Sequence, residues 1–489
     1  MTQLRLRQMT GLPRPLMAAA IVGSGLALFA GALASTDYGP YALAAALLAG
    51  FLALAVTTYN RDPILALLGL WVCEVFVRPV SSLFGYYSTT GQMIRHADEA
   101  MVFLLAVLTL RRFLGGSVPA PPWRFVFAAL GVLVCGISSA ILNAVPFEIA
   151  FVGAVLGVKL WIMVCLGVLL PWKESDLPRV YKVFATVGVV IALVGIADYF
   201  THGTISTALR GPSGGTSYRA DAVQSIFPTP GEYSLFMSLL FAVSFSRFAR
   251  AYRPEDLFLA VLFATSVLLS LRLKGFLSLV AVAGLVIVVS SAASPKRAAA
   301  ALLVGALLVF GGYRLEQAVI HKQVSTYTTT ETSARSRLYR AGEEIASDRF
   351  PLGVGFGRYA SYMSAKHYSP VYHEYGLSRV WGLSPRYSNF IEDTSWPSVI
   401  GETGYAGAAF FAAGILAMLV ACCRRLFRWP GREDWLPLAA LCAVAVLLLD
   451  SLGDPALFSW LAVGMVSILF CPLIVIPREA RDAAAGQTP

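Results

Sequence analysis

The chain has 489 residues, of which 57% are hydrophobic and only 13% are charged. A soluble domain has about a quarter charged residues, so this composition excludes an ordinary water-soluble globule. It also excludes a disordered chain, a fibrous repeat and a disulfide scaffold. The seven cysteines lie in or beside apolar runs without a CxxC spacing, which indicates buried thiols and neither a metal site nor a redox pair. The net charge is +10, but basic residues are spread over many loops, so we expect no nucleic-acid partner.

Repeated apolar runs of about 20 residues predict an all-α, polytopic integral membrane protein with fourteen transmembrane helices. Twelve is the alternative count, because at about 1.5 Å per residue the shortest runs barely cross a 30 Å apolar core. The first run is long enough to span, so we interpret it as a retained helix and not as a cleaved signal peptide. The predicted spans are residues 16–34, 39–57, 63–80, 97–114, 124–143, 148–171, 178–199, 231–248, 255–271, 273–291, 297–313, 396–421, 435–452 and 455–476.

These spans divide the chain into three parts. Residues 1–313 hold transmembrane helices 1–11, residues 314–395 form a long polar loop, and residues 396–489 hold helices 12–14 and a tail. A structureless loop of this length is unusual, so we expect it to fold over the membrane. Within it, residues 333–350 place apolar side chains at near-helical spacing between Arg and Glu, which predicts an amphipathic helix on the outer surface.

The placement of basic residues predicts the orientation of the spans. With the N-terminus inside, 21 of the 38 Lys and Arg residues fall in inner loops, as the positive-inside rule requires. We therefore predict a multi-pass membrane protein with both termini cytoplasmic and the long loop on the outer face. Lys159 lies inside a span, and sixteen basic residues lie on the outer face.

Cationic side chains at the outer mouth of a membrane protein are costly unless they meet an anion. Guanidinium groups bind phosphate oxygens in pairs and keep their charge near neutral pH. Cations contributed by different spans therefore predict a pocket for a diphosphate lipid headgroup, and the alternative is contact with ordinary phospholipid headgroups. The candidate diphosphate-binding residues are Arg219, Arg272, Lys274, Arg337 and Arg340.

Four short motifs follow one another along the predicted outer face. Arg219 precedes PTPGEYS, in which Pro230 breaks the backbone before a span, and Ser270 to Gly275 form a cationic hairpin tip. The turn PLGVGFGRY at 351–359 lacks the GK[ST] of a nucleotide loop. The fourth motif, DTSWPSVIGETGYAG at 393–407, leads from the long loop into a span.

In their order, spacing and side of the membrane, these motifs resemble the O-antigen ligase and O-antigen polymerase family of bacterial membrane glycosyltransferases, over roughly residues 215–410. The resemblance implies a multi-pass protein of the bacterial inner membrane with both termini cytoplasmic and the long loop periplasmic. It also implies a glycan donor on undecaprenyl diphosphate and an acceptor sugar hydroxyl on a glycan or glycolipid. Membrane lipids and a chain-length regulator are further partners that it suggests. Ligases of this family carry a His-Asn pair shortly before the glutamate of the last motif, where this chain has Asp393-Thr394. This departure favours a polysaccharide polymerase over a ligase that attaches glycan to lipid A core.

The chemistry that the resemblance implies needs a stabilised diphosphate leaving group and a general base. Arginines in a water-poor site can stabilise the leaving group without a metal, and no Asp-x-Asp pair lies on the predicted outer face, so we expect neither metal nor cofactor. The candidate bases for the acceptor hydroxyl are, in order, Asp393, Glu392 and His373.

Two of these candidates, and the glycine motif, also have structural interpretations. Asp393 can be a helix N-cap and His373 an ordinary surface histidine. We expect Glu402 to orient backbone or an arginine and not to react. Gly404 and Gly407 are expected to allow close helix packing.

Two further alternatives remain open at this point. A transporter or flippase of polyprenyl-linked glycan would also combine many spans with outer cations, but it should show two repeated halves. A structural scaffold would not need basic residues gathered on one face. The aromatic-rich stretch 359–396 suits either sugar rings or the lipid–water interface.

Overall fold

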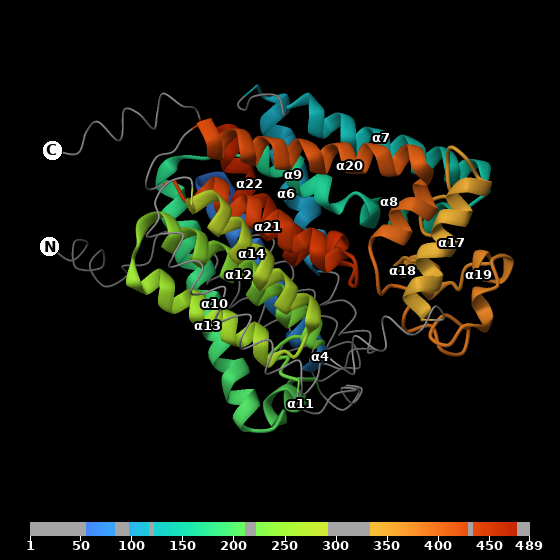
Figure 1. Cartoon of the computed structure of the whole chain (residues 1–489). Coiled ribbons are helices and arrows are strands. Elements are labelled where there is room, and N and C mark those ends of the chain that lie inside the picture. The colour runs from blue at the N-terminus through green and yellow to red at the C-terminus, as the bar shows by residue number, and fades with distance from the viewer. Residues whose placement is uncertain are drawn as a thin grey trace, which may run out of the picture. The chain divides into compact units, whose positions relative to one another are not determined.

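The computed structural model describes residues 55–83, 97–116, 122–210, 222–291, 333–428 and 434–476. The chain divides into two compact units, one made of 1–119 with 206–218 and the other of 120–205 with 219–489. Within the described residues, regular structure is helical throughout, apart from an isolated bridge between Ser384 and Tyr387 (Figure 1). The expected all-α fold is therefore confirmed for this part of the chain.

In the first unit, α4 (Pro63–Leu83) packs against α6 (Ala97–Leu114). The start of α4 is fixed by Asp62, whose Oδ1 accepts hydrogen bonds from the backbone N–H groups of Ile64 and Leu65 at 3.1 and 3.0 Å. A short polar side chain in this position satisfies backbone donors that a helix start leaves open.

Three central helices form the core of the second unit and are buried along most of their length. They are α12 (Pro230–Ala251), α21 (Leu436–Ser451) and α22 (Trp460–Val475). The helices around them are α7 (Trp123–Leu142), α9 (Lys159–Val168), α10 (Leu177–Phe200), α13 (Pro254–Leu269), α14 (Leu273–Ser291) and α20 (Trp396–Arg428). Helices α13 and α14 pack on α12, α9 packs on α22, and α7 runs along α20 (Figure 1).

Peripheral helices of this unit expose large apolar side chains. Val134 on α7, Leu193 on α10 and Phe258 on α13 are 61%, 55% and 67% exposed. Apolar surface of this extent is costly in water, whereas it is the ordinary surface of a helix that contacts lipid.

Five described helices are long and apolar enough to cross a membrane, and a bent pair makes a sixth. Shorter apolar helices cover Leu273–Val289, Leu436–Ser451 and Trp460–Val475. Each predicted span within the described residues coincides with a helix or, for 148–171, with the bent pair. The predicted spans 16–34 and 297–313, and most of 39–57, lie outside the described residues. The structure thus supports a multi-pass membrane protein, and the total of fourteen or twelve spans stays a prediction.

The bent pair consists of α8 (Phe147–Gly157) and α9, which meet at 55°. Lys159, the first residue of α9, is 7% exposed, and its ammonium lies 4.5 Å from the centroid of the Trp460 ring. The aromatic face offers partial negative charge to this buried cation.

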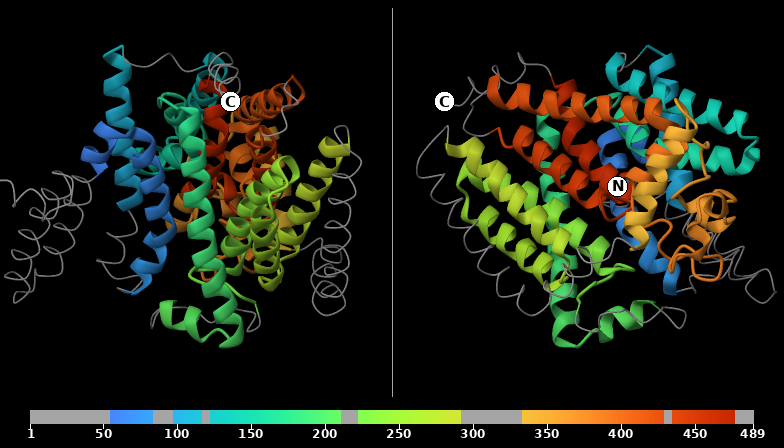
Figure 2. Two further views of the ribbon diagram at one scale, coloured as in Figure 1. Left: turned by 90° about the vertical axis from the view of Figure 1, so that its left-hand side faces the viewer. Right: turned by 45° about the vertical axis from the view of Figure 1, so that its right-hand side comes forward.

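The segment 333–395 folds into a small cluster of its own beside the start of α20 (Figure 2). It begins with α17 (Ala334–Asp348), where the Ser333 hydroxyl accepts from the backbone N–H of Ser336 at 3.2 Å. The predicted amphipathic helix is therefore present. Its apolar side chains are buried in protein, in a core formed by Leu338, Ala341, Ile345, Val354, Tyr359, Ala360, Val371, Tyr372, Leu377, Leu383 and Ile391.

The remaining elements are short. They are α11 (Thr204–Arg210), α18 (Tyr362–Lys366), α19 (Val371–Glu374) and the 3-10 turns Glu174–Asp176, Leu377–Arg379 and Ala456–Phe458.

Candidate functional site

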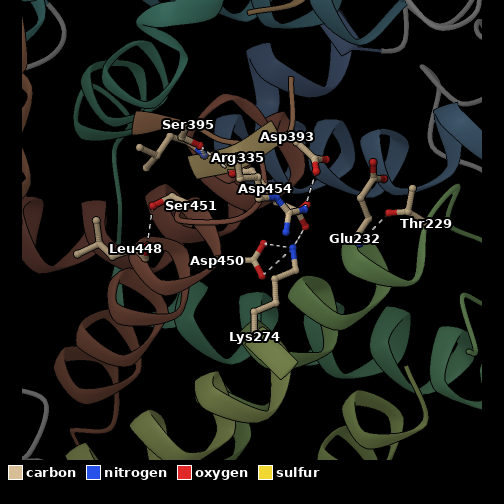
Figure 3. Close-up of polar contacts among 11 residues, drawn as sticks. Thr229, Glu232, Lys274, Arg335, Asp393, Ser395, Leu448, Asp450, Ser451 and Asp454 are labelled. Carbon is tan, nitrogen blue, oxygen red and sulfur yellow. Dashed lines mark hydrogen bonds and ion pairs between the residues drawn. The ribbon is translucent and has the colours of Figure 1, made fainter. Parts of the chain in front are cut away.

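A group of charged side chains lies where α12 and α14 begin and α21 ends. The ammonium of Lys274, in the first turn of α14, lies 3.4 Å from both carboxylate oxygens of Asp450 in the last turn of α21. It also pairs with the carboxylate of Asp454 in the loop that follows α21 (Figure 3). One cation is thus held between two carboxylates.

A second ion pair lies beside the first. Arg335, in the first turn of α17, donates from its guanidinium to Asp393, which precedes α20, at 2.6 Å. Both side chains are 26% exposed. We call Lys274, Arg335, Asp393, Asp450 and Asp454 the ion-pair cluster. Four of its five residues come from the last third of the chain and one from the α13–α14 hairpin, so it joins segments that are far apart in sequence.

Arg272, in the turn between α13 and α14, adds further positive charge. Arg272 and Arg335 both lie close enough to Lys274 and Asp450 to act on them electrostatically. Three cations from two separate segments therefore lie around the buried carboxylate of Asp450 at one end of the apolar helices. In such surroundings, where water is partly excluded, charge interactions are stronger than in bulk water.

Hydrogen bonds fix the backbone around the ion-pair cluster. Ser395 donates from its backbone N–H to the carbonyl of Ser451 at 3.2 Å and from its hydroxyl to the carbonyl of Asp454 at 3.0 Å. Trp396 donates to the Ser451 hydroxyl at 2.9 Å. The start of α20 is thus held against the end of α21 and the loop after it, which restrains the backbone that carries Asp393 and Asp454.

Tyr339 attaches α17 to the same loop. Its hydroxyl donates to the carbonyl of Leu452 at 3.0 Å. Burial raises the pKa of Tyr339 to about 12, against a smaller lowering by Arg335, so the hydroxyl keeps the proton that it donates.

The first turn of α12 lies against the Lys274–Asp454 pair. Pro230 opens this helix, and the Thr229 hydroxyl caps it by accepting from the backbone N–H of Glu232 at 3.2 Å. A Cβ built on Gly231 would lie 2.9 Å from a carboxylate oxygen of Asp454 and 3.5 Å from the Lys274 ammonium. The missing side chain at 231 therefore leaves room for the ion pair.

The structure brings together part of the predicted diphosphate set. Arg272 and Lys274 lie on one hairpin beside Arg335, whereas Arg337 and Arg340 are exposed on α17. Arg337 is two residues after Arg335 and therefore about 200° around the helix from it. Arg219 lies outside the described residues.

The three candidate bases lie in different surroundings. Asp393 belongs to the ion-pair cluster, and Glu392 beside it is exposed. His373 is exposed at the end of α19, where its ring lies edge-on to Tyr368 with 5.5 Å between centroids. No contact described for His373 connects it with the ion-pair cluster.

Glu402 connects α20 with the glycine-rich turn. Its side chain is buried and accepts hydrogen bonds from the backbone N–H of Tyr359 at 3.0 Å and from the Ser361 hydroxyl at 2.6 Å. Backbone N–H groups of Val354 and Gly355 donate to carbonyls of α20, the first at 2.9 Å and the second at 3.0 Å. Two motifs that are separate in sequence thus form one hydrogen-bonded unit.

Gly404 breaks α20 where this unit is attached. Its φ is +66°, and a Cβ there would lie 2.4 Å from the Pro351 carbonyl oxygen. A Cβ on Gly407 would lie 2.2 Å from the Thr403 hydroxyl and 3.3 Å from Cys135 of α7. Gly404 therefore permits a close backbone approach, and Gly407 leaves room for the side chains of Thr403 and Cys135.

Three residues of the ion-pair cluster, Arg335, Asp450 and Asp454, are not among the site residues predicted from the sequence. The run LLLDSLGDP places one aspartate in the last turn of an apolar helix and a second just after it, which is an expensive arrangement without a cation nearby. This energetic cost is the feature of the sequence that could have identified Asp450 and Asp454 as site residues. Among the described residues, no group of three or more His, Cys, Asp or Glu side chains is placed to hold a metal ion.

Comparison of the chain with models of known protein families and with functionally curated proteins gives no match. The structure itself supports a helical protein with several apolar helices of membrane-spanning length.

Proposed function

We propose that this protein is a membrane glycosyltransferase of the bacterial inner membrane. It transfers glycan from an undecaprenyl-diphosphate-linked donor to an acceptor sugar hydroxyl at the periplasmic face. The product is a polymerised surface polysaccharide or exopolysaccharide. The resemblance of the four motifs to O-antigen polymerases and ligases supports this choice of donor and reaction.

The observation that carries the proposal is the gathering of Arg272, Lys274 and Arg335 at one end of the apolar helices. A polyprenyl chain dissolves in lipid and holds its charged headgroup at the membrane boundary. Cations at the ends of apolar helices are therefore suited to binding such a headgroup. Guanidinium and ammonium groups together offer several donors to the phosphate oxygens of a diphosphate.

The reaction exchanges one bond at the anomeric carbon of the donor sugar. The bond from this carbon to the phosphate oxygen breaks, and its electron pair leaves with the diphosphate. The acceptor oxygen forms the new glycosidic bond and gives up its proton. Lys274 and the two arginines stabilise the charge that grows on the leaving diphosphate.

Asp393 is the proposed acceptor of the proton. It is bonded to Arg335 at 2.6 Å, and the phosphate groups compete for the same guanidinium. Donor binding thus weakens the hold of Arg335 on Asp393 and makes the carboxylate available as a base. General-base assistance of this kind contributes roughly 10²–10⁴-fold to a rate.

The proposal is tested with the purified full-length protein in liposomes that contain lipid-linked repeat units isolated from the source strain. We expect chains of increasing length and release of undecaprenyl diphosphate. Product that appears only after lipid A core is added would indicate a ligase. Movement of the donor between leaflets without consumption would indicate a flippase and contradict the proposal, as would an unconsumed donor with every acceptor.

A further inference from the structure

We propose that Asp454 is a displaceable stand-in for the donor diphosphate. Its carboxylate neutralises Lys274 between binding events and rotates away when phosphate oxygens take its place, whereas Asp450 stays paired with Lys274 throughout. This inference rests on the proposed diphosphate site and assigns its two aspartates different roles.

The first argument is the difference in burial between the two carboxylates. Asp450 is 1% exposed and Asp454 is 23% exposed, and both pair with the same ammonium. A buried carboxylate that loses its cation cannot reach water, so its separation from Lys274 is costly. A carboxylate at the edge can turn into solvent and recover its hydration. Asp454 is therefore the partner that exchanges.

The second argument is the way in which Asp454 is attached. Its backbone carbonyl accepts from the Ser395 hydroxyl at 3.0 Å, and Tyr339 holds the carbonyl of Leu452 in the same loop. These bonds restrain the main chain and leave the carboxylate its side-chain torsions. Displacement then needs a change between staggered rotamers and no movement of the loop.

The third argument is the space and charge at the carboxylate itself. Gly231 lies so close to the Asp454 oxygen that a Cβ would come within 2.9 Å of it. The glycine leaves the same space for a phosphate oxygen. In charge, Arg272, Lys274 and Arg335 are matched by Asp393, Asp450 and Asp454. Binding of a diphosphate would therefore leave excess negative charge at the site, unless one carboxylate moves away from the cations.

The experiment measures binding of inorganic pyrophosphate to the full-length protein in detergent by isothermal titration calorimetry. Asp454→Asn keeps the shape of the side chain and removes the competing charge. We expect it to lower the Kd for pyrophosphate by up to about fivefold, as the loss of one partly exposed ion pair implies. Asp454→Ser is a second variant in case the amide disturbs the fold, and Asp450→Asn should not tighten binding.

Glu343→Gln serves as the matched control because this exposed carboxylate lies on α17, away from the ion-pair cluster. Titrations at two salt concentrations separate direct competition from long-range attraction, since salt screens the latter more strongly. Wild-type binding with no tightening in either Asp454 variant would overturn this inference and leave the proposed function standing. Absence of pyrophosphate binding in the wild type and all variants would overturn the diphosphate site itself.

Discussion

The carboxylate of Glu402, near the start of α20, accepts a hydrogen bond from the backbone N–H of Tyr359 at 3.0 Å. This bond joins the glycine-rich turn to a helix that runs through the second unit. The ion-pair cluster uses residues on both sides of this connection, because Arg335 and Asp393 belong to the 333–395 segment whereas Asp450 lies on α21. The position of Glu402 therefore bears on the site without any contact with substrate.

Replacement of Glu402 by alanine should loosen the 333–395 segment. The backbone N–H of Tyr359 and the hydroxyl of Ser361 would lose their acceptor in a buried place, at a cost of about 1–3 kcal/mol each. Limited proteolysis should then cut the segment faster than in the wild type. Glu402→Gln keeps one acceptor oxygen and should have a smaller effect. Equal cleavage rates for wild type and Glu402→Ala would show that the connection does not hold the segment.

Replacement of Gly404 by alanine should destabilise the protein by about 1–3 kcal/mol from the backbone alone, because φ at this residue is +66°. The added Cβ would also meet the Pro351 carbonyl oxygen at 2.4 Å. Thermal unfolding in detergent, followed by tryptophan fluorescence, measures the effect. Gly284→Ala is the control, since a Cβ there has nothing within 4 Å and alanine favours a helix. A Gly404→Ala protein as stable as this control would refute the strained kink.

Replacement of Lys274 by alanine should reduce glycan transfer by about 10²-fold or more, the usual effect of removing one preorganised group that stabilises developing charge. Lys274→Arg keeps the charge in another shape and should retain part of the rate. The liposome assay measures product formed per mole of folded protein. Lys366→Ala, at an exposed position on α18, is the comparison that should behave as wild type. Near-normal transfer by Lys274→Ala would exclude this residue from the reaction.

Asp393 and Arg335 can be separated by a double-mutant cycle. Both side chains are 26% exposed, so the ion pair itself should contribute only about 0.2–1 kcal/mol to stability. Asp393→Asn should nevertheless lower the transfer rate by about 10²–10⁴-fold if the carboxylate accepts the proton. The rate and the apparent melting temperature are measured for both single variants and the double variant. An Asp393→Asn enzyme with near-normal transfer would exclude Asp393 as the base and favour Glu392.

The helices could be predicted because each one is determined by the local pattern of apolar and polar residues in its own segment. Apolar runs between polar turns located α7, α12 and α20, and Pro230 marked a helix start that the structure confirms. The 55° bend between α8 and α9 was not predicted. Apart from Glu148 at its start, the run from 148 to 171 has one charged residue, Lys159 at the break, and a single cation in an apolar run does not by itself indicate a bend.

The site was predictable in part. A cation between two apolar runs is expensive, and this cost singled out Arg272 and Lys274. The partner of Lys274 is 176 residues away, and no local pattern indicates such a pairing. The arginines of α17 are chemically alike, so packing alone decides that Arg335 faces the cluster while Arg337 and Arg340 are exposed.

The contact between Lys159 and Trp460 has a consequence for how α9 and α22 can vary. The ammonium lies 4.5 Å from the ring centroid, so the contact depends on the electron density of the indole as well as on its size. A leucine at 460 could occupy much of the same volume and would still give up that attraction. Tyrosine or phenylalanine would keep it in weakened form. Compatible substitutions at these two positions are therefore coupled: an aromatic ring at 460 is favoured for as long as residue 159 carries a charge.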